Sequence, residues 1–179
     1  PTLALFTTTR ALNLSDKYNF LLFAYVGLVL AVAQGGLYRP LAKRVREVAF
    51  LIAGSLLLIG GMAGLGLVAG LAEQPTANRG FVLAWLLIAL AVAVTGFAFI
   101  TPSLQALISR LSDPARQGAV LGVNQSASAM GRILGPAVGV PLYFLTPTHS
   151  GPYLLAVVVF AVVLLLCVII RRIQPAEAK

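Results

Sequence analysis

Apolar residues in this chain gather in five long runs that short polar connectors separate. The runs extend over about residues 18–37, 48–71, 81–107, 119–145 and 153–170. An α-helix rises 1.5 Å per residue, so each run is long enough to cross a hydrocarbon core of about 30 Å. The alternation of polar and apolar residues that marks a half-buried strand is missing, and an open sheet edge in lipid would leave backbone groups unpaired. We therefore expect an all-α, polytopic transmembrane helical bundle that forms a single transmembrane domain over residues 1–179.

The composition supports this interpretation. Hydrophobic residues make up 59% of the chain and charged residues 10%, with a mean hydropathy of +0.95. A soluble domain has about 25% charged residues, because its surface faces water. The net charge of +8 does not indicate nucleic-acid binding, since the cations sit in clusters between apolar runs rather than in a stripe interleaved with aromatic residues. The expected surrounding is a lipid bilayer, and no nucleic-acid partner is expected.

The cations also predict an orientation. When five spans are threaded through alternating sides, one side collects Arg39, Lys43, Arg44, Arg46, Arg110, Arg116, Arg171, Arg172 and Lys179. The other side holds only Arg10, Lys17 and Arg79. Cytoplasmic loops carry an excess of Lys and Arg, so the C-terminus is predicted to be cytoplasmic. The chain opens at Pro1 without a signal-peptide pattern, and we expect a truncated protein whose first residues end a further transmembrane helix.

The fourth run, residues 119–145, carries a polar stripe. One helical face and its edge hold the small and polar residues Asn124, Gln125, Ser128, Gly131, Arg132, Gly135 and Gly139. The opposite side is apolar, with Val123, Met130, Ile133, Leu134 and Ala137. A polar stripe on a transmembrane helix faces a protein interior or a water-filled cavity. Small residues spaced four apart allow helices to approach closely, so helix packing is expected at Gly131, Gly135, Pro136 and Gly139. Similar spacing recurs at Gly60 and Gly64 in the second run.

Arg132 lies near the middle of this run, where a cation costs roughly 2.5–3.5 kcal/mol on insertion scales and needs a partner or water. It either contacts an anion, a substrate or a coupling carboxylate in a cavity, or it bonds carbonyl groups freed by Pro136 and the glycines. Hydrogen bonding between helices is the alternative for the other transport-path candidates, which are Asn124, Gln125, Ser128, Thr101 and Gln105.

The residue types that carry enzymatic chemistry are poorly represented. All acidic residues sit in connectors or at termini, at Asp16, Glu47, Glu73, Asp113 and Glu177. No phosphate-binding glycine loop with a lysine is present, His149 has no acid or nucleophile at a readable spacing, and Cys167 is the only cysteine. We expect no enzymatic activity, no cofactor and no metal. If transport is driven by protons, the titrating carboxylate must lie in a missing part of the protein.

Two segments resemble a known family. The segment Gly27-Leu28-Val29-Leu30 through Gln34-Gly35-Gly36-Leu37, with residues 41–47, is similar to the connector between helices eight and nine of major facilitator superfamily transporters. Residues 118–126, followed by Gly131-Arg132-Ile133-Leu134-Gly135-Pro136, resemble their helix eleven. Together these segments resemble the C-terminal half of bacterial drug-efflux members, including tetracycline-resistance-type proteins, from the end of helix seven to helix twelve.

The resemblance implies a proton-coupled antiporter of the bacterial inner (plasma) membrane, in which two six-helix halves rock around a midplane site. The implied partners are a small-molecule substrate, protons and the missing N-terminal half. The implied cytoplasmic gating motif comprises Gly35, Gly36, Arg39, Lys43, Arg44 and Arg46. Lys43 stands where the stronger first-half motif has an Asp, so contact with lipid headgroups is an alternative role for these cations. Import of a metabolite or organic anion, and a non-transporting membrane scaffold, are alternative functions.

Overall fold

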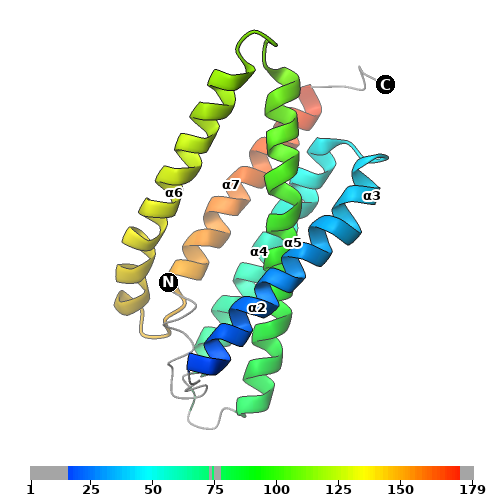
Figure 1. The fold of residues 1–179 in the computed structure, drawn as a ribbon. Helices are drawn as coiled ribbons and strands as arrows, with labels where there is room; N and C mark the ends of the chain where they lie inside the picture. The colour runs from blue at the N-terminus through cyan, green and yellow to red at the C-terminus, as the bar shows by residue number, and fades with distance from the viewer. Residues whose placement is uncertain (1–15, 73, 75–77, 174–179) are drawn as a thin grey trace.

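In a computed structural model the chain forms a bundle of long helices, with no strand among its described residues, 16–72, 74 and 78–173 (Figure 1). The elements are α2 (Asp16–Val32), the π-helix η1 (Ala33–Tyr38), α3 (Arg39–Ala42), α4 (Glu47–Ala72), α5 (Arg79–Leu111), α6 (Gln117–Leu145) and α7 (Gly151–Ile173). Within this part, five segments are long and apolar enough to cross a membrane: Lys17–Ala42, Glu47–Ala72, Arg79–Leu111, Gln117–Leu145 and Gly151–Arg172. The predicted all-α bundle with five spans is confirmed.

Some helices extend further than the hydrophobic runs predicted. Helices α2, η1 and α3 follow one another without a break, so residues 38–42 are helical and the connector to α4 shrinks to residues 43–46. Pro40 does not end this segment, and it lies at the start of α3, directly after the π-helix η1. Helix α5 likewise continues through Gly96 and Pro102 to Leu111.

Helix α4 is the centre of the packing. It lies against α5 on one side and α7 on another, while α2 crosses α5 (Figure 1). Apolar side chains of α2, α4 and α5 form one buried cluster around Leu22, Leu65 and Leu86. A second cluster, at the other end of α4, includes Val48 and Cys167, so the lone cysteine serves as a small buried hydrophobe.

The contact between α4 and α5 depends on glycine. A Cβ atom added at Gly61 would lie 2.5 Å from the backbone nitrogen of Ala93, and one added at Gly54 would lie 2.8 Å from the carbonyl oxygen of Gly96. The two backbones therefore meet without side chains between them. The sequence pattern pointed instead to Gly60 and Gly64. A Cβ at Gly64 would meet Ala89 at 3.1 Å, whereas one at Gly60 would meet nothing within 4 Å, so no described helix approaches Gly60 closely.

Helix α6 stands apart from this packed unit. Of its residues only Gly139 and Tyr143 are buried, and its contacts are confined largely to α5 and α7. Its apolar side is open, with Val123, Ile133 and Leu134 all more than half exposed. In a membrane, this apolar side suits contact with lipid or with further helices.

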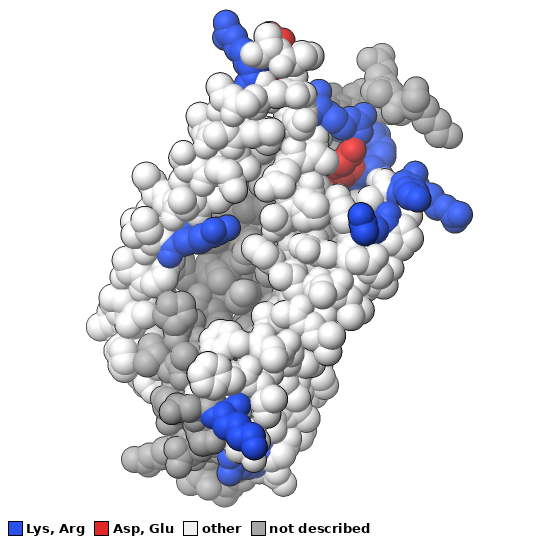
Figure 2. All heavy atoms as spheres, in the orientation of Figure 1, with Lys and Arg blue, Asp and Glu red and all other residues white. Residues whose placement is uncertain are grey.

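Apart from Arg132 in the middle of α6, the described basic side chains gather at the two ends of the bundle (Figure 2). The end formed by residues 43–46, the α5–α6 connector and the C-terminal turn of α7 holds Arg39, Lys43, Arg44, Arg46, Arg110, Arg116, Arg171 and Arg172. The opposite end holds Lys17 and Arg79; Arg10 and Lys179 lie outside the described residues. The bundle therefore has one strongly basic end, which is called the basic end below.

Candidate functional site

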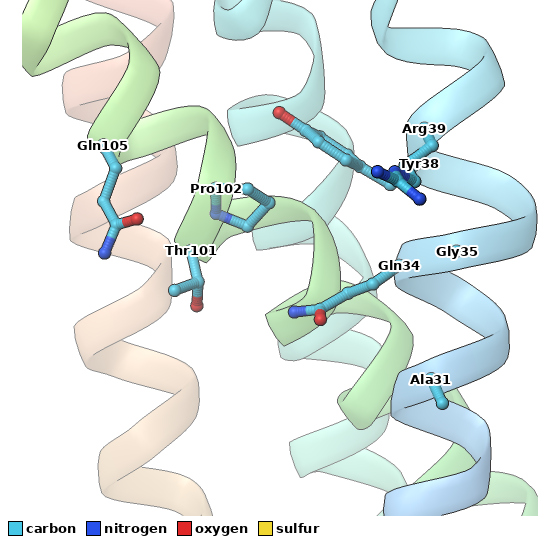
Figure 3. Close-up of a pocket in the computed structure, with 8 residues that line it drawn as sticks. All are labelled: Ala31, Gln34, Gly35, Tyr38, Arg39, Thr101, Pro102 and Gln105. Atoms are coloured by element: carbon cyan, nitrogen blue, oxygen red, sulfur yellow. The ribbon is translucent and has the colours of Figure 1, made fainter.

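An open pocket of about 500 Å³ lies between the first membrane span and α5 (Figure 3). Its walls are Ala31, Gln34, Gly35, Tyr38 and Arg39 on α2, η1 and α3, with Thr101, Pro102 and Gln105 on α5. In Figure 3 the Gln34 side chain reaches from η1 toward Thr101 and Pro102. The pocket thus combines two amides, two hydroxyl groups and a guanidinium, all able to hydrogen-bond with a ligand.

The π-helix η1 shapes one wall of this pocket. The backbone N–H of Arg39 donates to the carbonyl oxygen of Gln34, five residues earlier rather than the usual four. Gly35 and Gly36 lie within this wide turn. Both belong to the predicted gating motif and to the predicted first span, residues 18–37, and the structure places them inside the span Lys17–Ala42. A π-turn within a helix is often found at a functional site, because it redirects the side chains that follow it.

Tyr38 fixes the π-helix against α4 and α5. Its hydroxyl oxygen accepts a hydrogen bond of 3.2 Å from Ser103, which is fully buried in α5. Its ring lies 4.8 Å from the ring of Phe50 and 6.3 Å from that of Phe99, centroid to centroid. These contacts hold the pocket wall formed by η1 at a set distance from α5.

The polar groups on α5 differ in their availability. The Thr101 hydroxyl donates to the carbonyl oxygen of Phe97 at 3.1 Å, so its proton is used within the helix and only its acceptor lone pairs remain. The Gln105 side chain is exposed and makes no hydrogen bond within the part of the chain that the structure describes, and the same is true of the Arg39 side chain on the facing wall. A ligand therefore meets an uncommitted amide and an uncommitted cation.

The polar residues of α6 are not part of this pocket. Ser128 donates its hydroxyl proton to the carbonyl oxygen of Asn124 at 2.9 Å, and Gln125 is exposed. Two of the predicted path residues, Thr101 and Gln105, line the pocket. Gly35 and Arg39, which belong to the predicted gating motif, line it as well. The α6 stripe forms a second polar surface of its own.

Arg132 occupies the middle of this second surface. Its side chain is exposed and makes no hydrogen bond or ion pair to any described residue, so bonding to carbonyls freed by Pro136 is not what the structure shows. At 3.6 residues per turn, Arg132 shares a face with Gly139 and Tyr143, the two buried residues of α6. The guanidinium therefore belongs to the side of α6 that turns toward the bundle.

The glycines of α6 are less engaged than predicted. A Cβ atom added at Gly131 or at Gly135 would meet nothing within 4 Å, so no helix described here approaches them closely. Gly139 is buried and Pro136 is partly buried. A packing role for Gly131 and Gly135 stays a prediction for a contact with a helix outside the described residues.

Lys43, Arg44 and Arg46 form the connector that remains of the predicted gating loop, and all three are exposed. Next to them, the Glu47 carboxylate forms an ion pair of 2.6 Å with Arg110, which joins the start of α4 to the end of α5. The sequence pattern did not reveal this pair, because its partners are 63 residues apart.

Comparison with known proteins decides the family. The family model of the Major Facilitator Superfamily matches residues 1–179, the whole chain. This chain belongs to the Major Facilitator Superfamily. The superfamily consists of membrane transporters rather than enzymes, which agrees with the apolar helices described above.

One relative within the Major Facilitator Superfamily is the mouse protein named "Major facilitator superfamily domain-containing protein 10" (Mus musculus). It is 30% identical to this chain over 125 residues, which is 70% of this chain and 25% of the relative. The chain thus matches about a quarter of that relative's length. No solved structure matches the chain.

Proposed function

We propose that this chain is the C-terminal half, from the end of helix seven to helix twelve, of a proton-coupled exporter of small organic compounds. It would work by alternating access between the two sides of a membrane. Membership of the superfamily supports transport in general. The observation that carries the proposal is the open polar pocket between η1 and α5, with its uncommitted Gln105 and Arg39.

The proposed path runs along the two polar surfaces, the pocket and the α6 stripe with Asn124, Gln125, Ser128 and Arg132. Polar groups on membrane helices are costly unless they face water or protein, so surfaces of this kind suit the lining of a shared passage. The other wall of that passage would come from the N-terminal half of the same protein. Rocking of the two halves would then expose the surfaces alternately.

The proposed location is a bacterial inner membrane, with the basic end of the bundle and the C-terminus in the cytoplasm. The unequal distribution of cations between the two ends supports this orientation. The one acidic residue in the five spans is Glu47, the first residue of its span. A carboxylate that binds the coupled proton would therefore belong to the N-terminal half.

Replacement of Arg132 tests the proposed path. We expect Arg132→Ala in the complete protein to impair efflux of a fluorescent substrate while membrane insertion and expression stay normal, because it removes the only cation inside α6. Arg116→Ala, which removes a cation just before α6, is the matched control and should retain efflux. Normal efflux by the Arg132→Ala protein would remove this residue from the path.

A second candidate is import of an organic anion, which the uncommitted cations Arg39 and Arg132 favour. Paired uptake and efflux assays on the complete protein distinguish the two directions of transport. A cellular activity that needs no substrate and persists when Arg132 and Asn124 are both replaced would instead support a scaffold.

A further inference from the structure

A second, smaller pocket lies at the basic end, where the connector into α4 meets the last turn of α7. Its volume is about 160 Å³, and Arg46, Val48, Ala49 and Arg171 line it. This volume is several times the roughly 30 Å³ that one water molecule occupies in the liquid. The pocket shares no lining residue with the pocket between η1 and α5.

Two arginines from distant parts of the chain line this pocket. Arg46 and Arg171 are both exposed, and neither makes an ion pair with any residue that the structure describes. The carboxylate adjacent in sequence, Glu47, is already paired with Arg110 at 2.6 Å. Glu47 also attracts Arg46, but one carboxylate cannot balance Arg110 and both pocket arginines, so the pocket keeps a net positive charge. Guanidinium groups bind the oxygens of phosphates and carboxylates through paired N–H donors, so a phosphate group suits this pocket.

The rest of the pocket is apolar, and the apolar surface continues along both helices. Val48 is buried and Ala49 is exposed at the pocket itself. At helical spacing from Ala49 and Arg171, the next positions are Ala53 and Leu56 on α4, and Val168 and Leu164 on α7. All four are apolar and none is fully buried. A ligand with a phosphate head and apolar chains matches this surface along its whole length.

The depth of the pocket also suits a lipid. Helix α4 has 26 residues and is therefore about 39 Å long, which exceeds a hydrocarbon core of about 30 Å. Glu47 in the first turn of α4 and Arg171 and Arg172 in the last turn of α7 favour a place for these two turns at the level of the phospholipid headgroups. Anionic phospholipids attract basic residues placed at this level of a membrane.

We propose that Arg46 and Arg171 bind the phosphate of an anionic phospholipid whose acyl chains lie along the seam between α4 and α7. This site is independent of the direction of transport and of the transported compound. By bridging the start of α4 and the end of α7, the bound lipid stabilises the contact between them.

The test compares two double variants of the complete protein that remove the same number of charges at the same end. Arg46→Gln with Arg171→Gln alters the pocket, whereas Arg44→Gln with Arg172→Gln leaves its lining intact. Binding of phosphatidylglycerol and of phosphatidylcholine to the purified protein is measured by native mass spectrometry. With about 1 kcal/mol for each basic residue near a membrane surface, the pocket variant should bind phosphatidylglycerol about thirtyfold more weakly than the wild type.

The control variant should keep most of the wild-type affinity for phosphatidylglycerol, and inorganic phosphate should not displace the bound lipid. An equal loss in both double variants would show general attraction by surface charge and would overturn the site. Displacement of the lipid by millimolar phosphate would identify free phosphate as the ligand and would overturn the lipid assignment. Equal binding of phosphatidylcholine and phosphatidylglycerol by the wild type would also overturn it.

Discussion

Gly61 provides the sharpest test of the packing between α4 and α5. A methyl group added there would lie 2.5 Å from the backbone nitrogen of Ala93 and 2.6 Å from its Cβ. Carbon atoms in favourable contact lie about 3.5–4.0 Å apart, so Gly61→Ala must push the two helices apart by roughly 1 Å. A gap of that size removes a quarter to a half of the dispersion energy of each contact that it widens.

The adjacent Gly60 is the matched control, because a methyl group added there would meet nothing within 4 Å. Both changes gain about 0.8–1 kcal/mol of helix propensity, since alanine favours a helix over glycine. This gain cancels when the two variants are compared, and overpacking typically costs about 1–3 kcal/mol. We therefore expect the Gly61→Ala protein to be less stable than the Gly60→Ala protein by that amount.

The measurement is equilibrium unfolding of the complete protein in detergent micelles, with the wild type and both variants under the same conditions. Helix content by circular dichroism before unfolding shows whether each variant is folded at the start. Equal stability of the Gly60→Ala and Gly61→Ala proteins would refute the close approach of α4 and α5 at this position.

Three further predictions concern single interactions, each read by unfolding in the same micelles. Asn78→Ala should cost about 1 kcal/mol, because the Asn78 side chain accepts hydrogen bonds from two backbone N–H groups at the start of α5; an unchanged stability would argue against this cap. Tyr38→Phe should lower the free energy of unfolding by about 1–3 kcal/mol, because it leaves the buried Ser103 hydroxyl without its partner. Adding Ser103→Ala should recover much of this loss. A double variant that is no more stable than Tyr38→Phe would contradict this explanation. A double-mutant cycle on Glu47 and Arg110, each changed to Gln or Ala, should give an interaction energy of about 0.2–1 kcal/mol that weakens with salt. An interaction energy of zero at low ionic strength would show that the pair does not stabilise the protein.

The number of spans was predictable because a bilayer imposes one minimum length on every helix that crosses it. The ends of the helices were less predictable. Arg39 and Pro40 were predicted to lie in a connector. In the structure they begin α3, which continues the first span. Long basic side chains tolerate this position because they extend toward water.

The rotation of each helix about its axis was the hardest feature to predict. Glycine spacing in the second run is compatible with Gly60 or Gly61 facing α5, and the two positions differ by about 100°. Only the packed structure shows that Gly61 meets α5. Hydrophobicity could not decide between them, because the run is apolar on all sides.

The candidate site was partly predictable. Thr101 and Gln105 stood out as polar residues in the third apolar run, and Arg39 as a cation just after the first run. Gln34 and Tyr38 were missed as pocket residues, although their four-residue spacing places them near one face of a helix. The π-turn between them changes which positions share a face, and no sequence periodicity reveals it.

The glycine contacts between α4 and α5 also limit how this protein can move. Two backbones that touch at Gly54, Gly61 and Gly96 cannot slide past one another without collision, so a shearing motion between them is blocked. Spin labels placed on α4 and α5 should therefore keep a constant separation throughout a transport cycle. Relative motion within this chain would then fall on thinner contacts, which are those of α6 with α5 and α7 and those of the first span with α5.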